Sequence, residues 1–468
     1  MLRPSSLVAL SLLLALAACG DDDMSAADAG TRDAPGLDAP GVDAPGTDAP
    51  AADAPGTDAP GVDAFVPPTF GCGVLPPSTG TEMRIGPDRA DELPQIVQDA
   101  PTGTVILLED GTYRIGPDGE GNRRLQFHTP GVTLRSVSND ATTVILDGEY
   151  RTNETIFIDA NDVTIAHITV THAVDHGIHV TGAAPGNTER TILHGLRMID
   201  HGEQFVKVNA NGERTAFVDN GVLACSYFEL TDAGRPNIER SPGGCYTGGI
   251  DAHSAQGWHV YGNRFEDIYC AGEGLAEHAI HFWSASRDTL VEHNVILNCA
   301  RGIGFGLVEN GRERDYDDNP YPGVSTYIGH YDGIIRGNSI YADINFYDTG
   351  IELAQARGAR VLHNSVVSSP DASGFFSSID YRFESTDVEI RNNLVRRITR
   401  RNDAAGTVEN NLEAAPLDLF VDPAAGDLHL RASAAAAIDQ GVVAPGAGLD
   451  IDGETRDNGA PDLGADER

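Results

Sequence analysis

Residues 260–265 read VYGNRF, a hexamer that returns four times along the second half of the chain with its asparagine in the same place. The later copies are Val291-x-x-Asn294-x-Ile296, Ile335-x-x-Asn338-x-Ile340, Val361-x-x-Asn364-x-Val366 and Ile390-x-x-Asn393-x-Val395. At Val222-x-x-Cys225-x-Tyr227 a cysteine takes the asparagine position. A polar amide at a fixed point between apolar strand residues indicates turns that stack on one another, with asparagine side chains hydrogen-bonded along the stack.

A second short motif, one variable residue between two apolar ones, sets the length of the repeat. Its copies are Ile178-His179-Val180, Val206-Lys207-Val208, Ile250-Asp251-Ala252, Ile280-His281-Phe282, Ile303-Gly304-Phe305, Ile351-Glu352-Leu353 and Ile379-Asp380-Tyr381. They begin 23–30 residues apart, except for two intervals of 44 and 48 residues. Apolar residues alternate with period two in short runs, which predicts strands rather than helices. We therefore expect a β-solenoid over residues 87–413, with insertions in two of its coils.

Residues 93–115, LPQIVQDAPTGTVILLEDGTYRI, predict a short helix, a glycine turn, a buried strand and a second turn into another strand. This segment resembles the N-terminal cap and first coil of the pectate-lyase-like superfamily of right-handed parallel β-helices. The resemblance implies an all-β fold, with one right-handed parallel β-helix over residues 71–419 behind a short N-terminal capping helix. Residues 420–468 resemble a terminal segment of bacterial β-helix proteins, which we expect to cap the last open sheet edge.

Alternation along each strand predicts two polar rows on one outer face of the solenoid. The first row holds His179, Lys207, Asp251, His281, Gly304, Glu352 and Asp380. The second row, two residues further along each strand, holds Thr181, Asn209, His253, Trp283, Gly306, Ala354 and Arg382. We expect the two glycines of one coil to leave a notch for a ligand. The insertions at Ala210–Gly221 and Glu309–Asp332 are expected to wall this face into a groove.

Many members of the pectate-lyase-like superfamily cleave acidic polysaccharides by β-elimination, which needs a base and a positive group that neutralises the uronate carboxylate. The resemblance implies Lys207 as the base and calcium as the neutralising ion. His281 or His253 is the candidate proton donor to the leaving oxygen. The candidate oxygen ligands for Ca²⁺ are Asp251, Glu352 and Asp380. The candidate substrate contacts are His179, Asn209, Trp283 and Arg382, with the indole stacking on a sugar ring.

Three alternatives to the lyase stay open. The first is a non-catalytic glycan-binding or adhesive surface protein with the same fold. The second is a glycoside hydrolase, because Glu352 and Asp380 on adjacent coils, ~4.8 Å apart, match a retaining carboxylate pair; the signatures of polygalacturonase-like hydrolases are not evident. The third is a zinc site of His278, His281, His253 and Asp251. It is disfavoured because His278 and His281, three apart on a strand, are expected to face opposite sides.

Five cysteines follow Cys19, and export to an oxidising compartment permits disulfides between them. Cys270 and Cys299 are about one coil apart, so the spacing between coils suits a bridge. Cys225 and Cys245 flank an inserted loop and are the second candidate pair. Cys72 is then left over, and free buried thiols are the alternative.

The first 18 residues match an export signal, with Arg3, an apolar run too short to span a bilayer and a small-residue exit. The sequence LAAC at 16–19 resembles the lipobox of bacterial lipoproteins, which implies cleavage before Cys19 and acylation of that residue. Gly20 differs from the aspartate linked to inner-membrane retention, so we expect an outer-membrane lipid anchor as the only membrane attachment, on the periplasmic side or the cell surface.

Between the lipobox and the solenoid, residues 19–70 repeat Asp-Ala-Pro with a period of five. Proline removes backbone donors, repeated carboxylates repel, and little apolar surface is available to bury. We expect a disordered, extended acidic tether.

The 468 residues carry a formal net charge of −38. This acidity argues against a nucleic-acid partner, because phosphate binding needs a basic face. It also disfavours a polyanionic glycan unless a cation mediates. Polysaccharide remains the expected partner, and the expected state is a monomer.

Overall fold

The structure is a computed structural model that describes residues 72–116, 123–238, 240–241, 244–272, 274–307, 314–372, 377–456 and 459–468. The predicted signal (residues 1–18), the lipidation site Cys19 and the tether (19–70) lie outside the described residues and stay predictions. None of the described helices is long and apolar enough to cross a bilayer.

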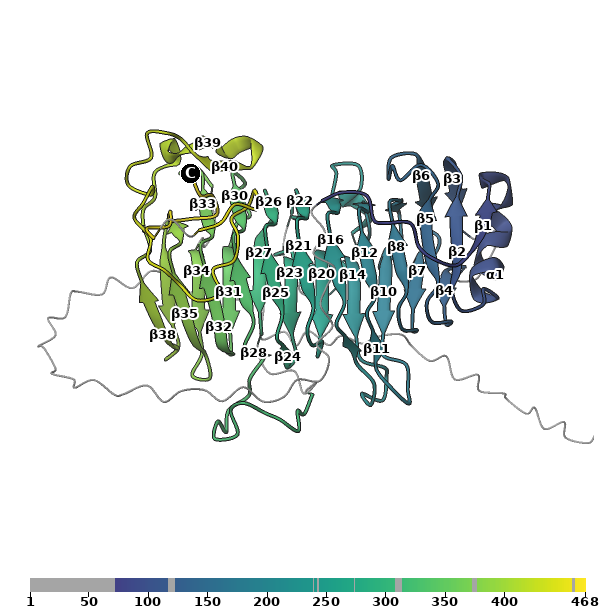
Figure 1. The fold of residues 1–468 in the computed structure, drawn as a ribbon, viewed down its shortest axis with the longest axis horizontal. Helices are drawn as coiled ribbons and strands as arrows, with labels where there is room; N and C mark the ends of the chain where they lie inside the picture. Colours follow the sequence, from purple (N-terminus) through teal and green to yellow (C-terminus); the bar gives the residue numbers. More distant parts are fainter. Residues whose placement is uncertain are drawn as a thin grey trace, which may run out of the picture. The chain divides into compact units, whose positions relative to one another are not determined.

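Three long parallel sheets form the body of the domain, each with one strand from every coil (Figure 1). The first sheet contains β1 (Thr81–Ile85), β2 (Thr104–Leu108), β5 (Thr133–Ser136), β8 (Thr164–Ala166), β12 (Ile192–His194), β16 (Val222–Ala224), β21 (His259–Tyr261), β25 (Leu290–Glu292), β29 (Ile334–Arg336), β32 (Ala356–Leu362), β35 (Asp387–Arg391) and β38 (Ala405–Glu409). The short strands β24 (Ser286–Arg287) and β28 (His330–Tyr331) join it beside β32.

The second sheet carries the predicted polar rows. Its strands are β4 (Leu125–Phe127), β7 (Ile156–Ile158), β10 (Ile178–Thr181), β14 (Gln204–Asn209), β20 (Gly248–His253), β23 (His278–Trp283), β27 (Arg301–Phe305), β31 (Thr349–Ala354), β34 (Ser377–Arg382) and β37 (Ile398–Arg401).

The third sheet completes each coil. Its strands are β3 (Gly111–Arg114), β6 (Val144–Asp147), β9 (Thr169–Thr171), β13 (Arg197–Ile199), β17 (Tyr227–Glu229), β22 (Arg264–Glu266), β26 (Val295–Leu297), β30 (Ser339–Ala342), β33 (Ser365–Ser368) and β36 (Leu394–Val395). Apolar side chains of all three sheets point inward and form one continuous core along the coil. The predicted β-solenoid is thus confirmed.

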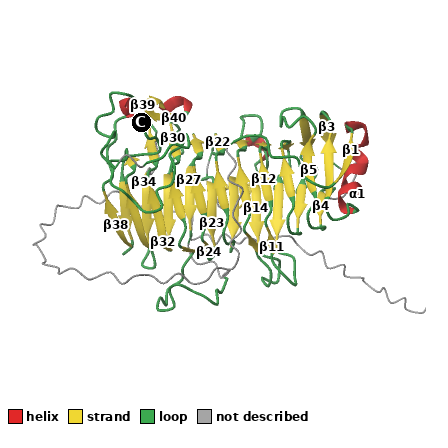
Figure 2. Cartoon of the chain, viewed as in Figure 1, coloured by secondary structure: helices red, strands yellow, loops and turns green. Residues whose placement is uncertain are grey.

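Short elements decorate the coil (Figure 2). They are η1 (Pro87–Glu92), α1 (Leu93–Gln98), η2 (Arg235–Asn237), η3 (Leu417–Leu419), η4 (Pro423–Ala425), β11 (Thr188–Glu189), β15 (Val218–Asp219), β18 (Arg240–Ser241), β19 (Gly244–Cys245), β39 (Phe420–Asp422) and β40 (Asp427–Leu430). The predicted helix–turn–strand–turn–strand order over 93–115 is confirmed by α1, β2 and β3. Leu93 and Val97 of α1 are buried in the main core, so the helix closes the N-terminal end of the solenoid.

The repeated asparagines form a ladder. The Nδ2 of Asn294 donates to the Oδ1 of Asn338 at 2.9 Å, and the backbone N of Asn294 donates to the same oxygen at 3.0 Å. The same pair of bonds joins every consecutive pair from Asn263 to Asn411. The assignment of Cys225 to the asparagine position was wrong by one residue. Leu223 pairs with Val260, so Ser226 takes the ladder position, and its backbone N donates to Asn263 Oδ1.

Both predicted disulfide pairs are wrong. The bridges join Cys72 to Cys225 and Cys245 to Cys270, with Cα separations of 5.1 and 6.1 Å, and Cys299 is a free, buried thiol. The reason is a second insertion in the long coil, residues 231–247, which the repeat spacing did not separate from the first. It carries Cys245 to Cys270, so Cys225 at a corner of the coil is left to bridge Cys72.

The segment that leads into the solenoid runs along its flank. From the Cys72 bridge it passes His194, whose Nε2 donates to Gly73 O at 2.8 Å, and His167, whose Nε2 accepts from Leu75 N at 3.1 Å. Figure 1 shows this stretch as the dark loop that crosses β16, β12 and β8 toward β1. The chain is therefore fastened to the middle of the domain before it enters the first coil.

The C-terminal segment differs from the expected edge cap. The edge strand β38 is exposed at all five residues. The described parts of this segment, residues 420–456 and 459–468, lie along the corners of several coils instead. Arg336 donates to Gly446 O at 2.8 Å, His363 lies 3.0 Å from Asp462 O, and Asn392 donates to Val442 O at 2.7 Å. A second apolar cluster, which includes Phe420 and Leu430, seals this segment to the third sheet.

The asparagine ladder predicts a graded loss of stability. We expect Asn338→Ala to lower the free energy of unfolding by about 3 kcal/mol, because it strips partners from fully buried backbone and side-chain groups on both neighbouring coils. Asn411→Ala, at the half-buried end of the ladder, is the matched control and is expected to cost less than half as much. Denaturant unfolding followed by circular dichroism measures both. Equal losses would contradict the ladder as the source of the effect.

Candidate functional site

The register of the second sheet brings the first polar row into line. His179 pairs with Lys207, Lys207 with Asp251, and Asp251 with His281. The row continues through Gly304, Glu352 and Asp380 on the next three strands. The second row is likewise in register between Thr181 and Asn209, His253 and Trp283, and Ala354 and Arg382. Residues scattered over 200 positions of sequence thus form two adjacent stripes.

The first row points away from the solenoid core but is not open to solvent. Lys207, Asp251, His281, Glu352 and Asp380 are each at most 3% exposed. The alternation along the strands predicts an outer face, and these groups do point outward, but they do not meet solvent. The difference arises because side chains of neighbouring coils, only ~4.8 Å apart, pack against one another and form ion pairs along the stack.

Asp251 is the centre of the largest cluster. Its Oδ2 accepts from Lys207 Nζ at 2.8 Å and lies 3.0 Å from His253 Nε2, and its Oδ1 accepts from Trp283 Nε1 at 2.7 Å. His281 Nδ1 is 3.4 Å from the same Oδ1. Burial opposes ionisation of this carboxyl, but Lys207 and His253 outweigh it and hold the pKa of Asp251 well below its usual range. All three candidate catalytic residues therefore surround one carboxylate.

Tyr246, which belongs to the insertion at residues 231–247, lies over this cluster. Its hydroxyl lies 3.3 Å from Lys207 Nζ. The repeat spacing does not predict this contact, because it does not place Tyr246 over β14. A buried ammonium held by a carboxylate, an imidazole and a phenol is strongly fixed in position.

The three candidate calcium ligands do not form one site. Asp251 and Glu352 are separated by two intervening strands, β23 and β27. Glu352 forms a short ion pair with Arg382, and Asp380 accepts from Arg401 at 2.7 Å. Each carboxylate is thus already neutralised by a basic side chain. These residues do not fit a calcium ion, which needs six to eight oxygen ligands around one point.

Glu352 and Asp380, the candidate hydrolase pair, are adjacent and differ in their ionisation. Burial opposes ionisation of both groups. The Arg382 guanidinium overcomes it for Glu352 and holds the pKa of that carboxyl well below its usual range. Burial prevails for Asp380, whose pKa is raised despite Arg401. A split of this kind occurs in acid–base pairs, although here both carboxyl groups are buried and ion-paired.

His179 and Asn209, two candidate substrate contacts, bind each other at 2.9 Å between Nε2 and Oδ1. His179 also pairs with Glu154, which in turn pairs with Arg124. Burial raises the pKa of Glu154, but His179 and Arg124 outweigh it and bring it to about 2.

A third outward row was missed by sequence analysis. Its members are His176, Gln204, Gly248, His278, Arg301, Thr349 and Ser377. In β14 and β23 two consecutive residues, such as Ala279 and Ile280, face the core. The strand therefore turns, and His278 lies on the same side as His281, with ring centroids 4.3 Å apart. The expectation that these two histidines face opposite sides was wrong. The sequence feature that could have predicted this turn is the small residue before each isoleucine that begins the strand motif.

The glycine notch is filled. A Cβ at Gly304 would lie 2.8 Å from both His278 Nε2 and His281 Cδ2. The glycine thus makes room for two imidazoles rather than for a ligand. At Gly306, with φ of +74°, a Cβ would meet the carbonyl oxygen of Ala354 at 2.0 Å.

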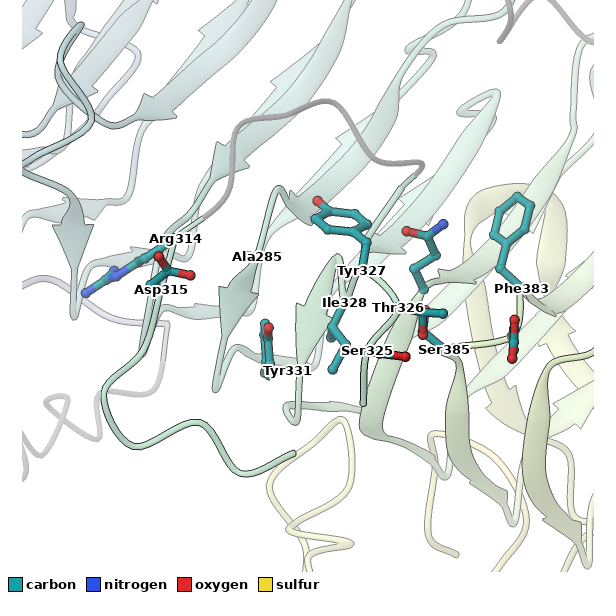
Figure 3. A pocket seen from close by; sticks show the side chains of 12 residues that line it. Ala285, Arg314, Asp315, Ser325, Thr326, Tyr327, Ile328, Tyr331, Phe383 and Ser385 are labelled. Atoms are coloured by element: carbon teal, nitrogen blue, oxygen red, sulfur yellow. The ribbon is translucent and has the colours of Figure 1, made fainter. Parts of the chain in front are cut away.

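An open cleft of about 650 Å³ lies where the chain leaves β23, β31 and β34 (Figure 3). Its walls come from residues 314–331 of the predicted insertion at Glu309–Asp332 and from the turns after these strands. The lining residues are Ala285, Arg314, Asp315, Ser325, Thr326, Tyr327, Ile328, Tyr331, Gln355, Phe383, Glu384 and Ser385. The rings of Tyr327, Tyr331 and Phe383 are drawn in Figure 3. The cleft differs from the predicted groove, because only the later of the two insertions lines it and it lies beside the second row rather than over the polar face.

The two predicted insertions are joined beside this cleft. Arg314 donates to both oxygens of Asp219, at 2.6 and 2.8 Å, and its guanidinium lies 4.3 Å from the ring of Phe217. Arg314 also donates to Ser254 O at 3.0 Å. Buried, bidentate pairs of this type fix the position of a loop. The cleft wall is thus anchored on the solenoid.

No protein-family model matches this sequence, and no curated protein matches it. Among solved structures, a pectate lyase, Pel9A, is similar with a TM-score of 0.53 and 15% identity, over 84% of this chain and 98% of that one. The chain is a right-handed parallel β-helix protein. An alginate lyase from Paenibacillus sp. str. FPU-7 matches with a TM-score of 0.46 and 16% identity, over 71% of this chain and 99% of that one. A rhamnogalacturonan lyase matches with 0.47 and 12%, over 73% and 91%.

The low pKa of Glu154 predicts acid sensitivity of this β-helix. A carboxyl whose pKa falls from 4.5 to about 2 on folding contributes stability above pH ~4.5, and that contribution is lost as the pH falls toward 2. We expect Glu154→Gln to cost about 2 kcal/mol at pH 7 and to flatten the loss of stability between pH 5 and pH 2. Unfolding free energies measured across this range test it.

The matched control is Glu149→Gln. This carboxylate is 29% exposed and lies 3.7 Å from Arg114 and from Arg151. Solvent screens such pairs, so we expect a change below about 0.5 kcal/mol at pH 7. A wild-type acid profile that Glu154→Gln leaves unaltered would contradict the assignment.

Proposed function

We propose that this protein binds polysaccharide, and that the cleft between the 314–331 insertion and the turns after β31 and β34 is the binding site. The observation that carries the proposal is the combination of Tyr327, Tyr331 and Phe383 with polar side chains in one open cleft of about 650 Å³. Aromatic rings stack on the apolar faces of sugars, while carboxylate, amide and hydroxyl groups bind sugar hydroxyls.

The charge of the cleft favours a neutral glycan. Asp315 and Glu384 place two carboxylates in the lining, while the guanidinium of Arg314 is already held by Asp219. A polyuronate would be repelled by these groups and by the net charge of −38. Neutral sugars, whose hydroxyls donate hydrogen bonds to carboxylates, suit the site better.

The fold supports polysaccharide as the class of ligand. Pel9A, with which the chain shares its fold, is a pectate lyase. A parallel β-helix presents a long stack of equivalent side chains, which matches the repeat of a polymer. Fold alone does not fix chemistry, so the cleft carries the proposal.

Cleavage by β-elimination is the second candidate function. The observation that favours it is the assembly of Lys207, His253, His281 and Tyr246 around Asp251. Lys207 can act as a base only if Asp251 no longer holds its ammonium group. The cluster also has to open so that substrate can reach Lys207. Because Asp251, Glu352 and Asp380 are held by basic side chains, we expect this activity not to depend on calcium.

We further propose that the domain is lipid-anchored to the outer membrane. The lipobox at Cys19 and the Asp-Ala-Pro tether support this location. About 50 residues of extended chain would hold the β-helix well away from the bilayer.

Loss of one aromatic ring tests the binding site. We expect Phe383→Ala to weaken retention on a neutral glycan matrix by about tenfold, because stacking contributes up to about 1.5 kcal/mol. The matched control is Phe346→Ala, which removes a half-buried ring that stacks on Tyr269 at 6.0 Å and does not line the cleft. Affinity electrophoresis against a panel of neutral and acidic glycans measures both. Equal effects of the two variants would argue against the cleft.

The lyase candidate has its own test, the ultraviolet absorbance of unsaturated uronate products on alginate, pectate and glycosaminoglycans. If Lys207 is the base, Lys207→Ala lowers the rate by at least about 100-fold, and Ca²⁺ added to chelator-treated protein does not raise the wild-type rate. Breaking the buried pair costs roughly 3–5 kcal/mol, so the folded fraction is measured for each sample. If the protein binds glycans but forms no unsaturated product from any of them, it is a glycan-binding protein and not a lyase.

A further inference from the structure

Glu277, His278 and His281 come together at the start of β23, beside Gly304 of the next strand. One ligand-type atom from each of the three lies within 4.8 Å of the others. The His278 side chain is 0% exposed, that of His281 1% and that of Glu277 9%. Two imidazoles and a carboxylate are thus held together out of contact with solvent.

His278 lacks the hydrogen bonds that a buried imidazole normally makes. Neither Nδ1 nor Nε2 has a hydrogen-bond partner among the described residues. The nearest carboxylate oxygen, Glu352 Oε2, is 3.6 Å from Nε2, which is longer than a hydrogen bond. Leaving a buried polar group unsatisfied costs about 1–3 kcal/mol. A missing ligand explains this better than chance packing.

His281 presents the nitrogen that a metal needs. Its Nε2 lies 3.2 Å from Gly306 O, so this nitrogen carries the proton and donates to the carbonyl. In the neutral ring the lone pair is then on Nδ1, which lies 3.4 Å from Asp251 Oδ1 and 3.9 Å from Glu277 Oε2. A backbone carbonyl that fixes the tautomer in this way is a regular feature of metal-binding histidines.

The glycine of the next strand makes the approach possible. Any side chain at Gly304 would collide with both imidazoles, since a Cβ there would lie 2.8 Å from His278 Nε2. The two rings can therefore lie over the backbone of β27, where their nitrogens converge with the carboxylate of Glu277.

We propose that Glu277, His278 and His281 bind a divalent transition-metal ion, with Zn²⁺ as the best match. Two imidazoles and one carboxylate are a typical three-residue zinc set, with the fourth position left for water or another oxygen ligand. Zinc bonds of about 2.0–2.2 Å bring tetrahedral donors to roughly 3.3 Å from one another. The three ligand atoms, which lie within 4.8 Å of one another, move closer by up to about 1.5 Å to reach that spacing. Calcium and magnesium, which prefer oxygen, do not suit this donor set.

The proposal does not rest on glycan binding and is tested on metal alone. The full chain, without a histidine tag, is stripped with a chelator and titrated with Zn²⁺ against a chromophoric competitor. We expect one ion per chain at this site, and binding at least about 100-fold weaker in His278→Gln and in His281→Gln. The matched control is His429→Gln, which removes a second cluster of His429, Asp452 and Asp466 in the C-terminal segment. It should leave the tight site intact.

Co²⁺ gives an independent readout. In the His429→Gln chain we expect the visible absorption bands of four-coordinate cobalt with nitrogen ligands, and we expect Zn²⁺ to displace them. These bands need no folded His278 variant, so they decide the matter if His278→Gln does not fold. The proposal is overturned if the wild-type chain binds no Zn²⁺, if His278→Gln binds as tightly as wild type, or if binding disappears only in His429→Gln.

Discussion

The whole molecule depends on one constraint, the in-register stacking of successive coils. Backbone hydrogen bonds join each strand to the equivalent strand of the next coil, and the amide ladder from Asn263 to Asn411 holds one corner of every coil in the same place. A slip by one residue would turn apolar side chains outward and break the ladder at once. The stack therefore has one register, and this register places the polar rows of the second sheet.

Stacking also dictates the electrostatics of the second sheet. Equivalent residues on neighbouring coils are only ~4.8 Å apart, so a charge on one strand needs an opposite charge close by. Asp251 forms an ion pair with Lys207, Arg382 with Glu352, and Arg401 with Asp380. The polar rows are for this reason mostly satisfied among themselves. The exceptions are informative: His278 is buried without hydrogen bonds, and the cleft beside Phe383 is open.

The insertions supply what the repeat cannot. Residues 314–331 wall the cleft, and residues 231–247 bring Tyr246 over Lys207 and Cys245 to Cys270. Both are long loops on a rigid scaffold, the usual location of binding residues. The Cys72–Cys225 bridge fastens the incoming chain to the middle of the solenoid, so the predicted tether would pull on a fixed point of the stack.

The sequence by itself determined the solenoid, its register and the membership of the two polar rows, because period-two alternation and a fixed asparagine position are local properties that repeat. The tertiary structure alone decided which cysteines pair and whether a polar row is buried. These depend on the paths of the insertions and on contacts between segments far apart in the chain, which no repeat spacing encodes. The turn that brings His278 to the side of His281 is local, and the small residue before Ile280 is its sequence signal.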